Sequence, residues 1–467
     1  MVTMSAGRLA ELTGGALVQG SADTTFAGIA IDSREVFAGC AFVAFPGERV
    51  DATEFVPAAV RDGARVAVVT RFDEVLSKAL EGTGAAIVVV ADASDAVRLL
   101  AAHTRSQLRC DVVGITGSTG KTTTKDFLAS VLAIRLQVAA TEGNRNNELG
   151  VPLTVLEAGA DTDVLVIEMG MRGRGQIEAL CEIARPTIGL VTNIGQTHIE
   201  LLGSQGAIVE AKAELVACVP ATGAVFLNGD DELSRSLASR SRAPVTYYGL
   251  SEDVSVRAEV LDVDEGGRPL VRLSEGGESV EARLPLPGRH NAYTAAAAAA
   301  VALHLGLGLG EVSQGLEQAK TTGMRMEVFA VASGVTLIND AYNANPTSMR
   351  AAINALTDVE TAGRRVAVLG DMAELGSLSE LAHFRLGEQV AVSGIDRLVT
   401  VGERARRIAE GARAAGMPPE AVLACPTTAE ATKALDDMLA PDDTVLVKAS
   451  RSMNLERVVE GIVRPHA

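Results

Sequence analysis

The sequence predicts an α/β protein of three domains, and three observations support this. Short apolar runs alternate with helical patterns along most of the chain, which is typical of parallel sheets covered by helices on both faces. At 467 residues the chain is too long for one ordinary hydrophobic core. Near residue 111 an apolar strand, a glycine-rich turn and a Lys-Thr pair follow one another, as they do in domains that bind a nucleoside triphosphate.

The first two regions differ in size and pattern. Residues 1–108 are predicted to form a smaller α/β domain, with strands at 42–45, 66–69 and 86–90. Residues 109–321 are predicted to form a central, mostly parallel sheet domain that opens with the phosphate loop. Its predicted strands include 164–167, 188–192 and 224–227.

Two later stretches of the central region have their own character. Residues 251–287 alternate Val with Arg and Glu and contain a Gly-Gly pair, which predicts an antiparallel addition to the sheet. Residues 292–305 are rich in alanine, so we expect a structural helix that packs closely against a neighbour. Residues 322–467 then predict a Rossmann-like domain, with strands at 335–338, 365–369, 397–401 and 444–447.

Composition narrows the class of protein. The chain is 47% hydrophobic and 22% charged, which is a globular composition. Its net charge of -17 disfavours nonspecific binding to nucleic acid, whose phosphates it would repel. Five dispersed cysteines without C-x-x-C spacing indicate reduced thiols. The sequence shows neither a signal-peptide pattern nor a membrane span, so we expect a cytoplasmic protein.

The phosphate loop is the most informative motif. Residues 111–124 read DVVGITGSTGKTTT. Backbone N–H groups in such a turn, together with a helix N-terminus, favour phosphate oxygens, while Lys121 can reach the β- and γ-phosphates and Thr122 can hold Mg²⁺. The strict spacing places a glycine where this chain has Ile115, and Gly114 and Gly117 make the turn instead. The alternative is a glycine-rich turn with no ligand.

Two further polar residues follow strands of the central region. Glu168 ends one predicted strand, and His198 follows another. Ligands of open α/β sheets bind beyond the carboxyl ends of the strands, so both residues are candidate Mg²⁺ ligands, although histidine is a less usual ligand for that hard ion. Alone, His198 would be interpreted as a structural histidine, and Lys212, on a predicted helix, as a surface lysine.

Other polar segments also follow predicted strands. The asparagine-rich segment 141–150 predicts a loop that hydrogen-bonds substrate, with a structural Asn-turn as the alternative. Segments 339–346, 370–376 and 448–451 each follow an apolar strand of the third region. All three therefore place polar groups at the carboxyl end of a strand.

These motifs together resemble a known family, the ATP-dependent Mur ligases of bacterial cell-wall synthesis, which share their architecture with folylpolyglutamate synthases. Residues 114–123, GITGSTGKTT, are similar to the family's ATP loop. Segments 143–152, 340–346 and 370–376 look like those of the members that add D-alanyl-D-alanine, and the Arg-His-Asn-Ala and Lys-Ala-Ser-Arg-Ser runs also match. The Asp-Asn-Pro signature expected of siblings that add lysine or diaminopimelate is absent.

The resemblance implies an activity. ATP would phosphorylate the terminal carboxylate of a UDP-N-acetylmuramoyl tripeptide to give an acyl phosphate, and the amine of D-alanyl-D-alanine would then displace phosphate and form an amide. The implied cofactors are ATP and Mg²⁺, and the implied partners are these two substrates, with no nucleic acid and no membrane span. We also expect a monomer.

The resemblance implies roles for individual residues. Lys121, Glu168, His198 and Lys212 would be catalytic, and Thr122, Glu168, His198 and Lys212 would hold metal, Lys212 after carbamylation to a carboxylate-like group. ATP would contact Gly117, Ser118, Thr119, Gly120, Lys121, Thr122, Thr123, Asn291, Arg325 and Asp340. The substrates would contact Ser33, Arg34, Gly47, Asp51, Asn144, Asn147, Tyr342, Asn343, Lys448 and Arg451. Segment 45–52 belongs to the expected uridine-nucleotide site of the first domain.

Three alternatives stay open. A sibling Mur ligase or a folylpolyglutamate synthase-like ligase would add a single amino acid instead of a dipeptide. A nucleotide switch would bind ATP without making a product, but it would not need the polar strand ends of the third region. A scaffolding module would not need Lys121, Glu168 and His198 together. The acceptor that triggers phosphate release separates the ligases from one another.

Overall fold

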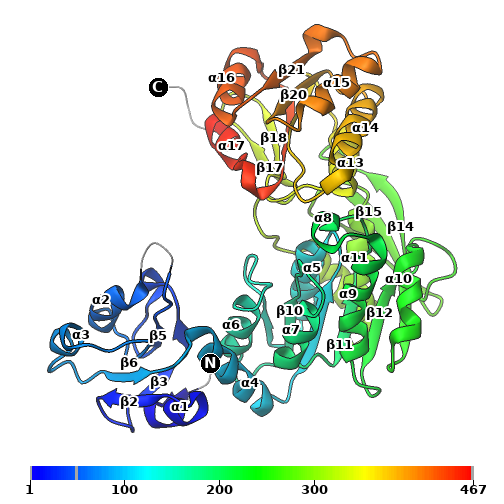
Figure 1. Ribbon diagram of the computed structural model, residues 1–467. Helices are drawn as coiled ribbons and strands as arrows, with labels where there is room; N and C mark the ends of the chain where they lie inside the picture. The colour runs from blue at the N-terminus through cyan, green and yellow to red at the C-terminus, as the bar shows by residue number, and fades with distance from the viewer. Residues whose placement is uncertain (1–2, 48–50, 464–467) are drawn as a thin grey trace. The chain divides into compact units, whose positions relative to one another are not determined.

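The computed structural model describes residues 3–47 and 51–463 (Figure 1). The protein is α/β, as predicted, and its described residues form sheets of nine, six, five and two strands. The chain divides into two compact units. Unit 1 comprises residues 1–114, 136–170 and 176–188, and unit 2 comprises 115–135, 171–175 and 189–467.

The N-terminal sheet has five strands in the order β2-β7-β6-β5-β4. The strands β4 (Ile29–Ala30), β5 (Ala41–Val43), β6 (Val66–Val69) and β7 (Ala86–Val89) run parallel, and β2 (Ala16–Gln19) is antiparallel. Strands β5–β7 confirm the three predicted from sequence. Their apolar side chains share one core with helix α2 (Val56–Arg61) and helix α3 (Glu74–Ala79).

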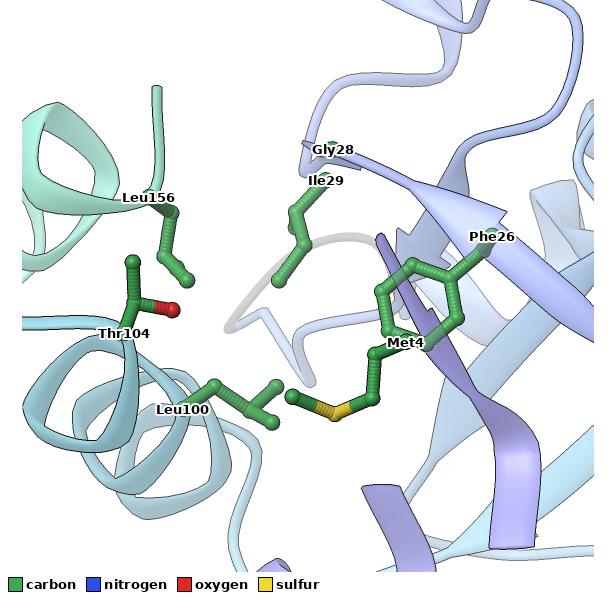
Figure 2. Close-up of a pocket in the computed structure, with 7 residues that line it drawn as sticks. All are labelled: Met4, Phe26, Gly28, Ile29, Leu100, Thr104 and Leu156. Atoms are coloured by element: carbon green, nitrogen blue, oxygen red, sulfur yellow. The ribbon is translucent and has the colours of Figure 1, made fainter. Parts of the chain in front are cut away.

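A small apolar pocket lies within unit 1 (Figure 2). Its empty volume is about 280 Å³, part of it open to solvent. One side is formed by the short pair β1 (Thr3–Ser5) and β3 (Thr25–Ala27) with the residues that follow, and the other by helix α4 (Ala93–Gln107) and helix α6 (Gly150–Glu157). The hydroxyl of Thr104 is buried without a hydrogen-bond partner in the described chain. The other side chains that line the pocket, those of Met4, Phe26, Ile29, Leu100 and Leu156, are apolar.

The central sheet has nine strands, in the order β16-β15-β14-β13-β12-β11-β8-β10-β9. The phosphate loop follows β8 (Asp111–Thr116), and β10 (Val164–Glu168), β11 (Ile188–Val191) and β12 (Ala224–Asn228) match predicted strands. The antiparallel addition is confirmed by three strands. They are β14 (Val256–Val263), β15 (Pro269–Glu275) and β16 (Glu278–Arg283). Sequence reasoning missed β9 (Val138–Ala140) and β13 (Val245–Gly249).

The alanine-rich helix packs as expected. Helix α11 (Asn291–His304) contacts β13, β14 and helix α5 (Lys121–Leu132), which follows the phosphate loop. The alanines from 295 to 300 are all buried. Because alanine carries only a methyl group, this helix can approach α5 and the sheet closely. The remaining central helices are α7 (Gln176–Ala184), α8 (Ile199–Leu202), α9 (Gln205–Cys218), α10 (Glu232–Ser236) and α12 (Leu309–Glu317).

The C-terminal sheet is doubly wound, as the Rossmann-like prediction requires. Its order is β17-β18-β22-β19-β20-β21, and only β17 is antiparallel. Successive residues of β19 (Arg365–Gly370) point into two different cores, so both faces are covered. The other strands are β17 (Glu327–Ala330), β18 (Thr336–Asn339), β20 (Arg397–Val401), β21 (Val422–Cys425) and β22 (Thr444–Lys448). Sequence reasoning missed β17 and β21.

Helices cover the two faces of this sheet (Figure 1). Helices α13 (Pro346–Asp358), α14 (Ser379–Val392) and α15 (Arg406–Ala414) share one core, and α16 (Thr428–Met438) and α17 (Glu456–Val463) share the other. The start of α13 is encoded locally, because Asn345 caps it through a 2.9 Å bond from the N–H of Ser348 and Pro346 occupies the first turn.

Helices α14 and α15 touch through two glycines. A Cβ at Gly387 would lie 1.9 Å from the carbonyl oxygen of Ile408, and a Cβ at Gly411 would lie 2.0 Å from that of Phe384. No side chain fits at either position. The two glycines therefore set the separation of these helices.

All five cysteines are free thiols, as predicted, and four of them are buried. Among the described residues, no helix combines the length and the apolar character needed to cross a bilayer.

Gly387→Ala is expected to lower the free energy of unfolding by about 1–3 kcal/mol, because its methyl group would overlap backbone on α15. Gly310→Ala is the matched control. Gly310 is exposed on helix α12, and a Cβ added there would have no neighbouring atom within 4 Å, so alanine there should add about 0.5–1 kcal/mol. Denaturant unfolding of both variants tests this, and equal effects would contradict it.

Candidate active site

The phosphate loop has the strand-loop-helix form that the sequence predicts. Ile115 is buried inside β8, so the turn begins after the strand instead of at that position. Gly117 is required by close approach, since a Cβ there would lie 1.8 Å from the Thr192 hydroxyl. Gly120 has φ 77° and precedes the first residue of α5, Lys121. The loop therefore presents backbone N–H groups at a helix N-terminus, which suits phosphate.

A neighbouring segment, residues 192–195, holds the loop in place. The Asn193 side-chain oxygen accepts the N–H of Thr119 at 3.0 Å, and its amide donates to the Thr119 hydroxyl at 2.7 Å. The Thr192 hydroxyl donates to the Thr119 carbonyl at 2.6 Å. Ser118 accepts the N–H of Gly195 at 2.8 Å. These bonds fix the backbone of the loop before any ligand is present.

Two lysines of unit 2 lie within electrostatic reach of each other. Lys121 donates from Nζ to the Gly117 carbonyl at 2.9 Å. Lys212, on α9, is only 2% exposed, so the surface interpretation of this residue is wrong. Burial, together with the positive charge of Lys121, holds the pKa of the Lys212 amine well below its usual range. The amine is therefore biased toward its neutral, nucleophilic form.

His198 is held by an acidic residue from the C-terminal region. Its Nδ1 is hydrogen-bonded to the Glu374 carboxylate. Burial lowers the pKa of His198, the Glu374 carboxylate raises it, and the charges of Lys121 and Lys212 lower it. Both His198 and Glu374 have φ 60°, in the left-handed region that non-glycine residues rarely occupy. The structure therefore joins His198 to both lysines electrostatically and to Glu374 directly.

Asp340 and Lys448 form a buried ion pair at the ends of β18 and β22. Lys448 is 2% exposed, and its Nζ contacts the Asp340 carboxylate at 2.5 Å and the carbonyl of Asn343 at 2.9 Å. These three residues, all predicted to contact ligands, are thus brought together. Arg451, also predicted, has an exposed side chain that pairs with Glu456 at 2.8 Å.

Arg325 and Tyr342 are stacked. The Arg325 guanidinium lies 4.1 Å from the centre of the Tyr342 ring, a cation–π arrangement. Arg325 Nε is buried without a hydrogen-bond partner in the described residues. Asn291 is also buried and donates to the Pro287 carbonyl at 2.9 Å, at the start of α11. Arg325 thus retains an unused donor, whereas the Asn291 amide already has a partner.

The phosphate-loop helix is bonded to the segment that leads into the C-terminal region. Asp126, on α5, accepts the N–H of Thr322 at 2.7 Å. Asp126 is 7% exposed and also contacts Lys125 at 2.6 Å. Residues Met324 and Met326 follow with left-handed backbone, φ 60° and φ 53°. The connection is therefore anchored and locally constrained.

Glu168 belongs to unit 1. It is 1% exposed, and its Oε1 accepts from the amide of Asn146 at 2.7 Å. Its own N–H donates to the Thr141 hydroxyl at 3.0 Å. The asparagine-rich loop therefore orients Glu168.

The two loop residues predicted to bind substrate differ. Asn147 accepts the N–H of Gly150 at 2.9 Å and that of Leu149 at 3.3 Å, so it supports the start of α6 as a structural Asn-turn. Asn144 is exposed.

The predicted nucleotide-binding residues of the N-terminal domain lie on the surface. Asp32 accepts the N–H of Arg34 at 2.9 Å and pairs with its guanidinium, and the Arg34 hydrogen bonds lower the pKa of Asp32 to about 2. Ser33 begins the short helix that Asp32 caps. Asp51 accepts from Thr53 and pairs with Arg71 at 3.0 Å, and Gly47 is exposed. Residues 48–50 of segment 45–52 lie outside the described residues.

The donor set suits Mg²⁺ only with help from phosphates. Within the described residues, no three His, Cys, Asp or Glu side chains gather as a metal cluster. Mg²⁺ commonly keeps several waters and binds through one or two carboxylates plus substrate phosphates, so a sparse protein contribution is consistent with it. The Thr197 hydroxyl, next to His198, is buried without a partner in the described residues, which leaves an oxygen available there.

Asn193 and Glu374 are the site residues that sequence reasoning missed as individual candidates. Asn193 lies two residues after β11, and Glu374 lies in the 370–376 segment after β19. The signal for both was the same, a polar residue just beyond a buried strand.

Comparison with known proteins matches three parts of the chain. Residues 25–105 match the Mur ligase family catalytic domain, residues 115–302 the Mur ligase middle domain, and residues 324–451 the Mur ligase glutamate ligase domain. Among relatives, the UDP-N-acetylmuramoyl-tripeptide--D-alanyl-D-alanine ligase of Bacillus subtilis is 35% identical, with 99% of each chain covered. The ligase of the same name from Escherichia coli is 34% identical, again with 99% of each covered.

Solved structures agree. A crystal structure of MurF from Acinetobacter baumannii is 32% identical, covers 99% of each chain and superposes with a TM-score of 0.84. MurF from Thermotoga maritima in complex with ADP is 27% identical, with 93% of this chain and 97% of that chain covered and a TM-score of 0.76. The likeness therefore extends over essentially the full length in both sequence and structure, and the protein belongs to the Mur ligase family.

Proposed function

We propose that the protein is an ATP-dependent, ADP-forming ligase that joins D-alanyl-D-alanine to a UDP-N-acetylmuramoyl tripeptide. The observation that carries the proposal is the full-length likeness to ligases of this one name. The solved MurF relative in complex with ADP supports nucleotide binding by this protein. The strand-end residues of the C-terminal region also match those of the members that add a dipeptide.

The proposed reaction has two steps. The terminal carboxylate of the tripeptide attacks the γ-phosphorus of ATP, and ADP leaves, giving an acyl phosphate. The amine of D-alanyl-D-alanine then attacks the acyl carbon, loses a proton and expels phosphate, which leaves an amide. Both steps develop negative charge on oxygen. Positively charged and N–H groups placed beforehand therefore lower both barriers.

We assign the phosphates to the loop and its helix. The Lys121 amine and the N–H groups at the start of α5 would bind the β- and γ-phosphates, with Thr122 and Thr123 in its first turn. The N–H groups of Ser118 and Thr119 instead donate to Asn193. The tether from Asn193 to Thr119 supports this assignment, because it holds the turn that leads into the first residue of α5.

We assign Mg²⁺ to Thr122, Glu168, His198 and a carbamylated Lys212. The ion would polarise phosphoryl oxygens and neutralise their charge. The lowered pKa of Lys212 supports carbamylation, since only a neutral amine adds CO₂, which forms an N–C bond and releases a proton. The carbamate carries a negative charge. It would attract both the nearby positive charge of Lys121 and a metal cation.

The nucleotide and substrates would contact the remaining predicted residues. Arg325 and Asp340, with Asn291, are proposed for ATP, and Tyr342, Asn343, Lys448 and Arg451 for the acceptor side. Asn144 and Asn147 are proposed for the peptide substrate. The N-terminal domain, residues 1–108, is proposed to bind the uridine nucleotide through Ser33, Arg34, Gly47 and Asp51, with the domains at 109–321 and 322–467 supplying catalysis.

The direct test measures phosphate release from ATP with a UDP-N-acetylmuramoyl tripeptide, with and without D-alanyl-D-alanine. We expect release only with the dipeptide, and a product that is heavier by one dipeptide unit. Turnover with a single amino acid would assign a sibling activity instead. ATP binding without turnover for any acceptor would support a nucleotide switch.

Lys121→Ala should reduce phosphate release by at least about 10²-fold, because the variant loses a charge at the developing phosphoryl oxygens. Its fold should persist, because Lys121 is the first residue of α5 and alanine is a strong helix former. Initial rates and circular dichroism measure both. Lys433→Ala removes an exposed lysine of α16 and should behave as wild type. Near-normal rates in Lys121→Ala would remove the loop from the mechanism.

Lys212→Ala should lose roughly tenfold or more of the activity and regain part of it with added formate or acetate. These acids can enter the vacated space and replace a carbamate. Lys212→Met is the matched control, because its longer side chain fills that space and should block the rescue. Full activity in Lys212→Ala, or equal rescue of both variants, would exclude the carbamate role.

A further inference from the structure

The contact between His198 and Glu374 places a hydrogen-bond acceptor against one ring nitrogen. A carboxylate oxygen accepts hydrogen bonds, so the contact favours a proton on the His198 Nδ1 that faces it. In the neutral imidazole the proton is then absent from Nε2, which keeps a lone pair. Glu374 thus selects the tautomer in which Nε2 is the free ligand atom.

The contact joins two loops that lie far apart in the sequence. His198 precedes α8, and Glu374 lies in the loop after β19, 176 residues later. The backbone also connects them, because the N–H of Glu200 donates to the Glu374 carbonyl at 3.3 Å. A Cβ at Gly376 would lie 3.3 Å from the Glu200 Cβ. The two loops are therefore packed together through backbone as well as through side chains.

The loop that carries Glu374 is itself held firmly. His383, a fully buried histidine of α14, accepts the N–H of Met372 at 2.9 Å. Ser450, after β22, accepts the N–H of Ala373 at 2.8 Å and donates its own N–H to the Asp371 carbonyl at 3.0 Å. These bonds come immediately before Glu374. They fix the backbone from which its carboxylate reaches His198.

The left-handed backbone of both His198 and Glu374 is a second observation that indicates a functional role for their contact. Residues other than glycine in this region are strained and persist where the surroundings impose this backbone. His198 and Glu374 both adopt φ 60°, and their side chains meet. Such strain is typical of positions where geometry serves a function.

We propose that Glu374 is a positioning residue that orients His198 and fixes its tautomer so that Nε2 can bind a divalent cation. This inference rests on the proposed metal role of His198. Histidine ligands generally donate their second ring N–H to a carboxylate, and loss of that partner costs about tenfold to a hundredfold in metal affinity. The C-terminal region thereby contributes to a cation site whose proposed ligands all belong to the central region.

The first experiment reads the tautomer in metal-free, full-length protein. Two-bond ¹H–¹⁵N correlation spectra distinguish Nδ1–H from Nε2–H, and His198→Gln identifies the signal. We expect Nδ1–H in the wild type and a mixture in Glu374→Ala. Glu374→Gln should keep Nδ1–H, because its amide oxygen still accepts a hydrogen bond. An unchanged tautomer in Glu374→Ala overturns the proposal, whatever the enzyme's activity.

The second experiment measures Mn²⁺ affinity by electron paramagnetic resonance, with a non-hydrolysable ATP analogue bound. Glu374→Ala should bind Mn²⁺ about tenfold to a hundredfold more weakly, and Glu374→Gln should fall between it and the wild type. Glu200→Gln is the matched control. It removes the same charge from an exposed residue two positions after His198, so it should match the wild type if orientation rather than net charge matters.

The outcomes separate this inference from the proposed function. Wild-type Mn²⁺ affinity in Glu374→Ala, or equal losses in Glu374→Ala and Glu200→Gln, overturns the positioning role. Wild-type affinity in His198→Gln removes the metal role of His198, and the inference fails with it. If ligation of the dipeptide is not observed but the tautomer and affinity shifts are, the positioning role stands and the proposed substrate is wrong.

Discussion

The site depends first on the hydrogen bonds that tie the phosphate loop to the segment after β11. A glycine-rich turn is conformationally permissive and would not hold one shape alone. Asn193 removes that freedom by bonding to Thr119 in both directions, while the missing side chain of Gly117 leaves room for Thr192. The backbone of the loop is thus held by neutral polar contacts with a neighbouring segment, and the Lys121 amine by the carbonyl of Gly117. The turn that leads into α5 therefore has one defined shape.

Hydrogen bonds between loops also hold polar groups in place in the C-terminal region. There the loops after β18, β19 and β22 are bonded to one another through Asp340, Lys448 and Ser450. Each of these loops follows a buried strand, so the rigid sheet fixes where each polar group begins. Hydrogen bonds among the loops then fix the positions of the polar side chains. His198 receives its orientation from this assembly through Glu374 rather than from its own strand.

The elements that sequence reasoning found and missed differ in burial. Strands β6, β10, β12 and β19 were predicted because both of their faces are covered, which gives continuous apolar runs. Strands β9 and β17 are partly exposed along their length, so their sequences lack such runs. Both are edge strands. They exist because a neighbouring strand supplies hydrogen bonds, which no local pattern records.

The sequence predicted which residues belong to the candidate site, but not which of them contact one another. Glu168 and His198 follow strands, and this marked them. The pairing of His198 with Glu374 spans 176 residues and could not be read from spacing. The burial of Lys212 was hidden too, because α9 carries apolar residues on more than one face and so does not reveal which side meets the core.

The bond between Asp126 and Thr322 has a mechanical consequence. Helix α5 begins at Lys121, and Asp126 lies five residues further along the same rigid element. A displacement of α5 would therefore be passed to Thr322 through this bond. Met324 and Met326, with their left-handed backbone, come next and lead into β17. The helix that begins at the phosphate loop and the segment before the last sheet are thus mechanically connected.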